Sequence, residues 1–234
     1  MTKKTTRPAA YPRLTTVLDA IPETEVVADI GYDHGYLIRH LVRRPEAPRV
    51  IGVEIQPDLA RRFRDRHDDL PPDVRARIDL RTGDGLRPLR PGETRVAVMA
   101  GIGERAMLTM LADASAVAGR LETLVLCPSH PPVHLVHELG AAGWWLEREW
   151  LVAERRHLYW VGRAVRGTAL PAGEPFRFFG ATLREPPHPL LVSFAAYIQR
   201  RNLFMFRHRD RQPPLRAAFC DHVLAILRTV DPGV

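Results

Sequence analysis

Apolar and polar positions along the first 165 residues predict strands and helices in alternation. Five short apolar runs, each followed by glycine or a polar residue, are typical of buried parallel strands. The predicted strands cover residues 26–30, 49–55, 78–81, 95–100 and 124–127. Apolar residues at helical spacing predict helices over residues 11–21, 36–43, 58–69, 105–118 and 133–142. This alternation indicates an α/β fold built on a parallel sheet.

The alternation of strands and helices stops after residue 143. Two extended runs, residues 145–153 and 157–165, are separated by only three charged residues, which predicts an antiparallel hairpin. Five parallel strands extended by a terminal antiparallel pair are the layout of a Rossmann-like Class I methyltransferase sheet. We therefore expect a basic, disordered tail over residues 1–10 and a single main domain over residues 11–166.

A linker rich in glycine and proline (residues 167–175) precedes a different pattern. Two amphipathic helices are predicted from apolar residues that recur on one face of each. These residues are Leu191, Phe194 and Ile198 in the first helix, and Leu215, Phe219, Val223, Ile226 and Val230 in the second. Residues 207–214 between them are basic. We therefore predict a small C-terminal helical hairpin, residues 175–234, with a basic tip.

Charge indicates the kind of partner. The formal net charge is +7 and the isoelectric point is about 10.1, which fits a polyanionic partner such as nucleic acid. From residue 166 onward ten arginines stand against five acidic residues, so most of the excess lies in the last third. The arginines expected to contact RNA phosphates are Arg200, Arg201, Arg207, Arg209 and Arg211.

The cysteines and the hydropathy of the chain indicate its expected cellular location. Cys127 and Cys220 are far apart in sequence, so neither a disulfide framework nor a metal site is predicted. Residues 1–10 are polar and basic without a following apolar core, and no apolar run is long enough to span a bilayer. We therefore expect a cytoplasmic protein with no membrane contact, and a monomer is the favoured state.

The end of the first predicted strand suggests a cofactor. Asp29 precedes Gly31, where a tight turn is expected, and Asp33 follows two residues later. A dinucleotide site needs Gly-x-Gly-x-x-Gly, so that bare backbone N–H groups hold a pyrophosphate. Asp33 takes the place of the second glycine and would repel phosphate. An acidic turn instead suits S-adenosylmethionine, which carries an ammonium group, a sulfonium group and hydroxyls.

Later strand ends supply further candidates. Glu54 closes the second strand, where a carboxylate can accept both ribose hydroxyls. Asp84 follows the third strand between two glycines and is placed to hold an adenine amino group, and Gly101 leaves open space after the fourth. The predicted cofactor residues are Asp29, Gly31, Glu54, Ile55, Asp84, Gly85, Ala100 and Gly101. Each alone also fits a helix cap or a turn, so the interpretation rests on their recurrence at successive strand ends.

Together these residues resemble the TrmK family, bacterial methyltransferases that act on N1 of adenine 22 in tRNA. The matching stretches include residues 27–31, 33–37, 83–86, 100–101, 124–126 and 179–180. The resemblance implies a Rossmann-like S-adenosylmethionine domain and a C-terminal coiled-coil pair that helps to bind tRNA. It also implies that Asp33, His34 and Tyr36 line the face where the target base enters. Ser129 would then take part of the role of the family's asparagine.

Several residues depart from the family pattern. They are Tyr32, Glu104, Ser129, Val136 and Trp160, and all are expected on the acceptor side of the site. These departures motivate two alternatives: a methyltransferase for another RNA base or a small molecule, and a catalytically degenerate protein that binds S-adenosylmethionine or RNA. A dehydrogenase is disfavoured because the chain lacks Gly-x-Gly-x-x-Gly.

Overall fold

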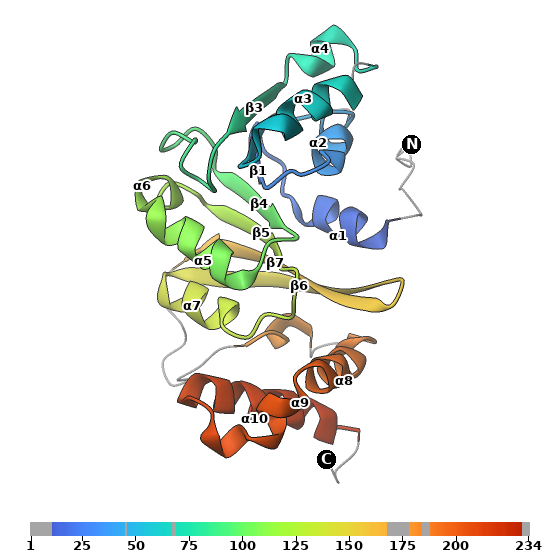
Figure 1. Ribbon diagram of the computed structural model, residues 1–234, viewed down its shortest axis with the longest axis vertical. Coiled ribbons are helices and arrows are strands. Elements are labelled where there is room, and N and C mark those ends of the chain that lie inside the picture. The colour runs from blue at the N-terminus through green and yellow to red at the C-terminus, as the bar shows by residue number, and fades with distance from the viewer. Residues whose placement is uncertain (1–10, 45, 67–68, 168–177, 184–187, 231–234) are drawn as a thin grey trace.

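A seven-stranded sheet forms the centre of the computed structural model, with strand order β3-β2-β1-β4-β5-β7-β6 (Figure 1). The strands are β1 (Val26–Ile30), β2 (Arg49–Glu54), β3 (Ile78–Thr82), β4 (Val96–Ala100), β5 (Thr123–Cys127), β6 (Trp144–Glu154) and β7 (His157–Arg166). The first five strands pair in parallel, and β7 joins β5 antiparallel. The predicted α/β fold with a terminal hairpin is therefore confirmed.

The structure describes residues 11–44, 46–66, 69–167, 178–183 and 188–230. The predicted tail, residues 1–10, lies outside these ranges, as do residues 175–177, 184–187 and 231–234 of the predicted C-terminal hairpin. The helices before the hairpin are α1 (Pro12–Ala20), α2 (Tyr36–Leu41), α3 (Pro57–Arg66), α4 (Pro72–Arg75), α5 (Glu104–Asp113), α6 (Ser115–Ala118) and α7 (Leu135–Ala141). After it come η1 (Ala181–Leu183), α8 (Leu191–Arg201), α9 (Leu203–Arg207), η2 (Arg209–Arg211) and α10 (Pro214–Arg228).

The parallel strands β1, β2, β4 and β5 are buried on both faces because helices cover each side, whereas β3 at the edge is partly exposed. Successive side chains of a strand point to opposite faces, so Ala97 and Met99 of β4 join one apolar cluster, while Val96 and Val98 join the other. The first cluster includes residues of α5, α6 and α7, and the second includes residues of α1, α2 and α3. This three-layer packing holds the carboxyl ends of five strands at one edge of the sheet.

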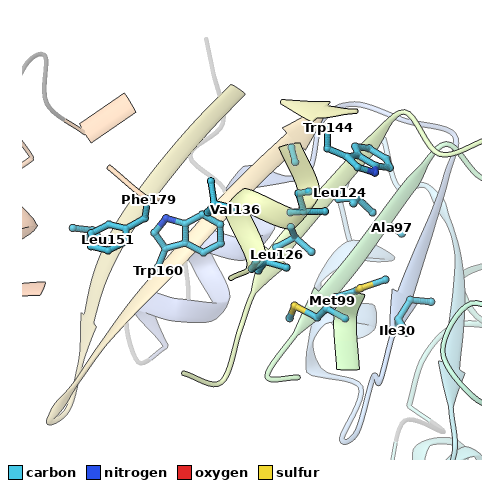
Figure 2. Packing of buried hydrophobic residues seen from close by; sticks show 14 of the residues in the cluster. Ile30, Ala97, Met99, Leu124, Leu126, Val136, Trp144, Leu151, Trp160 and Phe179 are labelled. Carbon is cyan, nitrogen blue, oxygen red and sulfur yellow. The ribbon is translucent and has the colours of Figure 1, made fainter. Parts of the chain in front are cut away.

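The C-terminal helices join the same apolar cluster as the first face of the sheet. Phe179, Phe194 and Phe219 are fully buried and pack edge to face. Figure 2 shows Phe179 beside Leu151 of β6 and Trp160 of β7. In Figure 1 the C-terminal helices lie beyond β6 at one end of the molecule.

Glu149 of β6 connects this end of the sheet to the chain that follows. Its buried carboxylate accepts hydrogen bonds from Trp160 Nε1 (2.8 Å), the N–H of Gly180 (2.7 Å), and the N–H and Oγ1 of Thr182 (3.0 and 3.2 Å). The two carboxylate oxygens together accept all four hydrogen bonds in an apolar setting. Their mutual satisfaction therefore fixes residues 180–182 against the hairpin.

Three details of the predicted helices are wrong. The helix expected over residues 105–118 breaks at Ala114 (φ −114°, ψ 46°), which separates α5 from α6. The short helix α4 (Pro72–Arg75) lies between the expected helix over residues 58–69 and the expected strand over residues 78–81, where no helix was predicted. Val230, expected on the buried face of the last helix, is 69% exposed because α10 ends at Arg228.

Strand β6 is the last strand of the sheet on its side. Its pairing with β7 shifts register between Leu146 and Arg148, so Glu147 stands at an irregularity in the ladder. Arg163 of β7 forms an ion pair with Glu147. The hairpin is thus charged at the place where its regular pairing is interrupted.

Candidate functional site

Gly31 makes the turn that follows β1. Its φ of +71° is in the left-handed region, and its N–H donates to Val53 O at 2.8 Å. A Cβ added here would lie 3.1 Å from Cδ1 of Ile102, so a side chain would be both strained and crowded. Ile102 therefore covers the turn from the loop after β4, and glycine is required beneath it.

Asp29 is a buried carboxylate whose Oδ2 has no hydrogen-bond partner among the described residues. It is 3% exposed and lies two residues before Gly31 on β1. Burial, and secondarily the charge of Glu54, raises its pKa to about 7. A buried acid without a cation is costly to ionise, so this position favours a ligand that brings its own positive charge.

Glu54 at the end of β2 is 7% exposed and faces the same turn. Its Oε2 accepts from the N–H of Asp33 at 3.3 Å, and its Oε1 accepts from the N–H of Gln56 at 3.1 Å. The carboxylate thus joins the turns after β1 and β2. Ile55, the next residue, is 62% exposed and presents an apolar surface beside it.

A pocket of about 140 Å³ opens at this end of β1. Its lining combines the cofactor and acceptor candidates Asp29, Gly31, Asp33, His34, Tyr36 and Ala100 with Arg13, Leu14, Val17, Tyr32 and Leu37. The structure therefore brings six of the predicted site residues together. Leu14 and Val17 belong to α1, an element that was not predicted to take part in the site.

The acceptor candidates stand at the surface of this pocket. Asp33 is exposed and adopts φ +46°, and its Oδ1 lies 3.5 Å from Nδ1 of His34. Tyr36 is 52% exposed and stacks on Tyr11, with ring centroids 6.4 Å apart and an interplanar angle of 21°. A charged group and two stacked aromatic rings thus border the opening, an arrangement suited to a planar, polar ligand.

Asp84 and Gly85 lie elsewhere along the same edge. Asp84 forms an ion pair with Arg87 (3.3 Å) and lines a separate cavity of about 160 Å³ against α5. Gly85 is buried with φ +56°, and a Cβ there would lie 2.5 Å from Cγ of Met110. Gly101 has φ +78° with open space around it, as predicted for the end of β4.

Ser129 is exposed after β5 and is not among the residues that line the Asp29 pocket. Its N–H donates to Ile102 O at 3.0 Å, and its hydroxyl lies 3.0 Å from Nδ1 of His130. The first contact attaches Ser129 to the loop that covers Gly31. Ser129 is therefore next to the site rather than in its wall.

Of the five family departures, Tyr32 lines the Asp29 pocket and the other four do not. The expectation that all five lie on the acceptor side is therefore corrected for Glu104, Val136 and Trp160. Tyr32 is 5% exposed and packs against Phe63, and burial raises its pKa to about 12. Val136 and Trp160 are buried in the apolar cluster of Figure 2. Oε2 of Glu104 accepts the N–H groups of residues 133–135 at 2.8–3.2 Å. Glu104, Val136 and Trp160 stabilise the fold and do not line the Asp29 pocket.

The arginines predicted to contact RNA differ in their surroundings. Arg209 is already paired with Asp221 (2.7 Å) and lies near Asp210 (3.5 Å). Arg200, Arg207 and Arg211 are exposed. Arg201 lines a cavity of about 370 Å³ with Arg105, Arg216 and Phe204, three residues that were not predicted to contact RNA. Their separation in sequence, with Arg105 on α5, hid this grouping.

In the described part of the chain, no group of three or more histidine, cysteine, aspartate or glutamate residues is placed to hold a metal ion. No helix within those residues is long and apolar enough to cross a bilayer.

A sheet of this strand order, with an acidic turn after β1, defines the Rossmann-like class of methyltransferases. The chain belongs to the methyltransferase domain family, whose model matches residues 10–161.

Known proteins similar to this chain are found at the sequence and structure levels. The tRNA (adenine(22)-N(1))-methyltransferase of Bacillus subtilis is 34% identical over 146 residues, which is 61% of this chain and 54% of that protein. The chain thus matches about half the length of that relative. Streptococcus pneumoniae Sp1610 in complex with S-adenosyl-L-methionine has a TM-score of 0.77 at 20% identity, covering 92% of this chain and 98% of that one. B. subtilis TrmK has a TM-score of 0.71 at 22% identity, covering 92% and 94%.

Proposed function

We propose that this protein transfers a methyl group from S-adenosylmethionine to N1 of adenine 22 in tRNA. The observation that carries the proposal is the buried Asp29, whose Oδ2 is unpaired beside the Gly31 turn. That position suits the ammonium group of the cofactor. The similarity to the B. subtilis enzyme supports the tRNA substrate, and the bound cofactor of Sp1610 supports the methyl donor. A tRNA substrate also agrees with the expected cytoplasmic location.

The residues present fit this cofactor along the edge of the sheet. Asp29 would accept the ammonium protons, and Glu54 would accept from the ribose hydroxyls while keeping its bonds to two backbone N–H groups. Ile55 offers an exposed apolar face for the adenine, and Asp84 is accessible for its amino group. Ala100 at the end of β4 also lines the pocket, and β4 lies on the other side of β1 from Glu54 and β2.

When bound, S-adenosylmethionine supplies a methyl group on a sulfonium. Adenine N1 is a nucleophile with its own lone pair, so the protein needs to align the reactants rather than remove a proton. The aromatic pair of Tyr36 and Tyr11 offers a stacking surface for the base. The carboxylate of Asp33 at the mouth of the pocket stabilises the positive charge that the ring gains. Because the base is stacked in folded tRNA, it must be turned outward to reach the pocket.

The case for an alternative acceptor is weaker in the structure than in the sequence. The alternatives rested on five departures from the family pattern, and three of those residues, Glu104, Val136 and Trp160, pack in the core or cap a helix away from the Asp29 pocket. Ser129 remains as the one exposed departure near the loop of Ile102. A different RNA base is therefore the alternative to include in the test, since this residue replaces a family asparagine.

The test measures methyl transfer by the full chain to unmodified tRNA. Labelled S-adenosylmethionine is the donor, and nucleosides are analysed by mass spectrometry. We expect 1-methyladenosine in wild-type tRNA and none in tRNA whose adenine 22 is replaced by guanine. Methylation that persists in the replaced tRNA, or that appears on another base, would overturn the proposed substrate. Cofactor binding without any transfer would favour the degenerate protein.

Replacing Asp33 should separate turnover from cofactor binding. Asparagine tolerates the left-handed backbone of Asp33 (φ +46°), so Asp33→Asn removes the charge and keeps the turn. We expect kcat to fall roughly 10- to 100-fold as the developing charge loses its partner. Calorimetry should show S-adenosylmethionine affinity within about twofold of wild type. A parallel loss of affinity would instead assign Asp33 to the cofactor.

A further inference from the structure

A larger cavity, of about 370 Å³, lies where the C-terminal helices meet the main domain. Arg201, Asn202, Leu203, Phe204 and Met205 line it from the corner between α8 and α9, and Arg216 lines it from α10. Glu104 and Arg105 at the start of α5, with Val133 and His134 before α7, complete the wall. Since α5 and α7 follow the carboxyl ends of β4 and β5, the cavity opens on the same edge of the sheet as the Asp29 pocket.

The charges in this cavity are unbalanced. Three arginines, Arg105, Arg201 and Arg216, line it against the single acid Glu104. Oε2 of Glu104 already accepts three backbone N–H groups, so that oxygen is used by the fold. Among the described residues, no acid lies within ion-pair distance of the three arginines, and Arg216 has only His134 nearby (3.5 Å). Guanidinium groups without an acidic partner are suited to binding phosphate.

An aromatic side chain stands at the same cavity. Phe204 is 75% exposed, and the neighbouring Leu203 is 47% exposed. The centroids of the Phe204 and His208 rings lie 4.6 Å apart, with an interplanar angle of 55°. A base that stacks on an exposed aromatic ring while its phosphate meets arginines is the usual mode of binding single-stranded nucleic acid.

We propose that this cavity binds one unpaired nucleotide of the RNA substrate, with its phosphate on Arg105 and Arg201 and its base on Phe204. The inference rests on the proposed function, because it takes the substrate to be RNA. It moves the main contact away from the predicted basic tip, since Arg207, Arg209 and Arg211 do not line the cavity. The loop 101–104 connects the two sites: Ile102 covers Gly31, and Glu104 lines the cavity.

The test is equilibrium binding of a fluorescein-labelled, unmodified tRNA transcript to the full chain over a range of salt concentrations. Arg105→Gln and Arg201→Gln remove exposed charges at the cavity. Arg120→Gln is the matched control, because Arg120 is exposed just before β5, at the opposite edge of the sheet. We expect each cavity variant to weaken binding about fivefold and to lower the salt slope by about one. Arg120→Gln should change the tRNA affinity and the salt slope by no more than the loss of a surface charge away from the RNA does.

Phe204→Ala tests the base contact separately. We expect it to weaken tRNA binding about tenfold and to leave heparin binding unchanged, because heparin has charge but no bases. Equal losses for both ligands would overturn the stacking role. S-adenosylmethionine affinity, measured by calorimetry for every variant, should match wild type and shows that each is folded.

Two outcomes would overturn the cavity proposal. In the first, the cavity variants bind tRNA as Arg120→Gln does. In the second, they lose binding to polyglutamate while tRNA binding stays unchanged, which would indicate an acidic protein partner. Both outcomes are independent of methyl transfer, so the proposed function would stand if wild-type transfer is observed. Conversely, tight tRNA binding through the cavity without methyl transfer would overturn the proposed function and uphold the cavity.

Discussion

Asp29→Asn is expected to reduce S-adenosylmethionine affinity roughly 30- to 100-fold, which is the loss of one charge-assisted contact of about 2–3 kcal/mol. Asparagine retains the shape of the side chain but cannot neutralise the ammonium group. Asp58→Asn on the exposed start of α3 is the matched control and should leave affinity unchanged. Equal affinities for Asp29→Asn and wild type in calorimetry would remove Asp29 from the cofactor site.

The same substitution is expected to stabilise the unliganded protein at neutral and higher pH. The pKa of Asp29 is about 7 in the folded protein, against an ordinary value of 3.8 in the unfolded chain. This difference is worth about 4 kcal/mol. A raised folded pKa gives stability that is complete below pH 3.8 and is lost as the pH rises through 7. Wild type therefore loses this stability between about pH 4 and pH 7, and the asparagine variant does not.

Urea unfolding at pH 5 and pH 8 measures this effect. The free energy of unfolding of Asp29→Asn relative to wild type should rise by about 2–3 kcal/mol between these pH values. All other titrating groups are common to both proteins, so their contributions cancel. A difference that is the same at both pH values would show that Asp29 titrates at an ordinary pKa. Wild-type cofactor affinity should also weaken as the pH falls below 7, because the ammonium group requires the ionised carboxylate.

Glu149→Ala is expected to cost about 3–5 kcal/mol of stability. The substitution leaves the indole N–H of Trp160 and the N–H groups of Gly180 and Thr182 without their acceptor in a buried setting. Glu149→Gln should cost less, since one amide oxygen can still accept. Chemical denaturation followed by tryptophan fluorescence measures both.

The control for Glu149 is Glu122→Ala, which breaks the exposed ion pair with Arg95 and should cost less than about 1 kcal/mol. If Glu149→Ala were as mild as this control, the carboxylate would not be what fixes residues 180–182 to β6. Folded Glu149→Ala should also keep its S-adenosylmethionine affinity, because the Asp29 pocket does not include this end of the sheet.

The strands were predictable because each carries a complete local signal. Strand β1 begins and ends as expected, since an apolar run is closed by a glycine at positive φ. The break at Ala114 has no such signal, because neither glycine nor proline marks it and the apolar spacing continues to Val117. Packing of α5 and α6 against the sheet decides it. The prediction for Val230 was wrong for a similar reason, because the apolar spacing continues beyond Arg228, where α10 ends.

The candidate site divides in the same way. Strand-end residues such as Asp29 and Glu54 could be predicted because parallel strands bring their carboxyl ends to one edge. The roles of Glu104 and Glu149 could not, since each acts on backbone groups about 30 residues away in sequence. Tyr32 lines the pocket with Gly31 and Asp33, but it is only 5% exposed and its ring packs against Phe63, which the sequence did not indicate. The cavity of Arg105 and Arg201 depends on contact between elements far apart in the chain.

The irregular pairing of β6 has a consequence for the protein at high concentration. A terminal strand presents a free row of backbone N–H and C=O groups, on which a strand from a second molecule can align and begin aggregation. The register shift at Leu146 and Arg148 interrupts that row, and Glu147 and Arg163 place charges beside the interruption. Further along the strand, Gly180 and Thr182 are already bound to Glu149. The β6 edge of the sheet is thereby protected against growth from one molecule into the next.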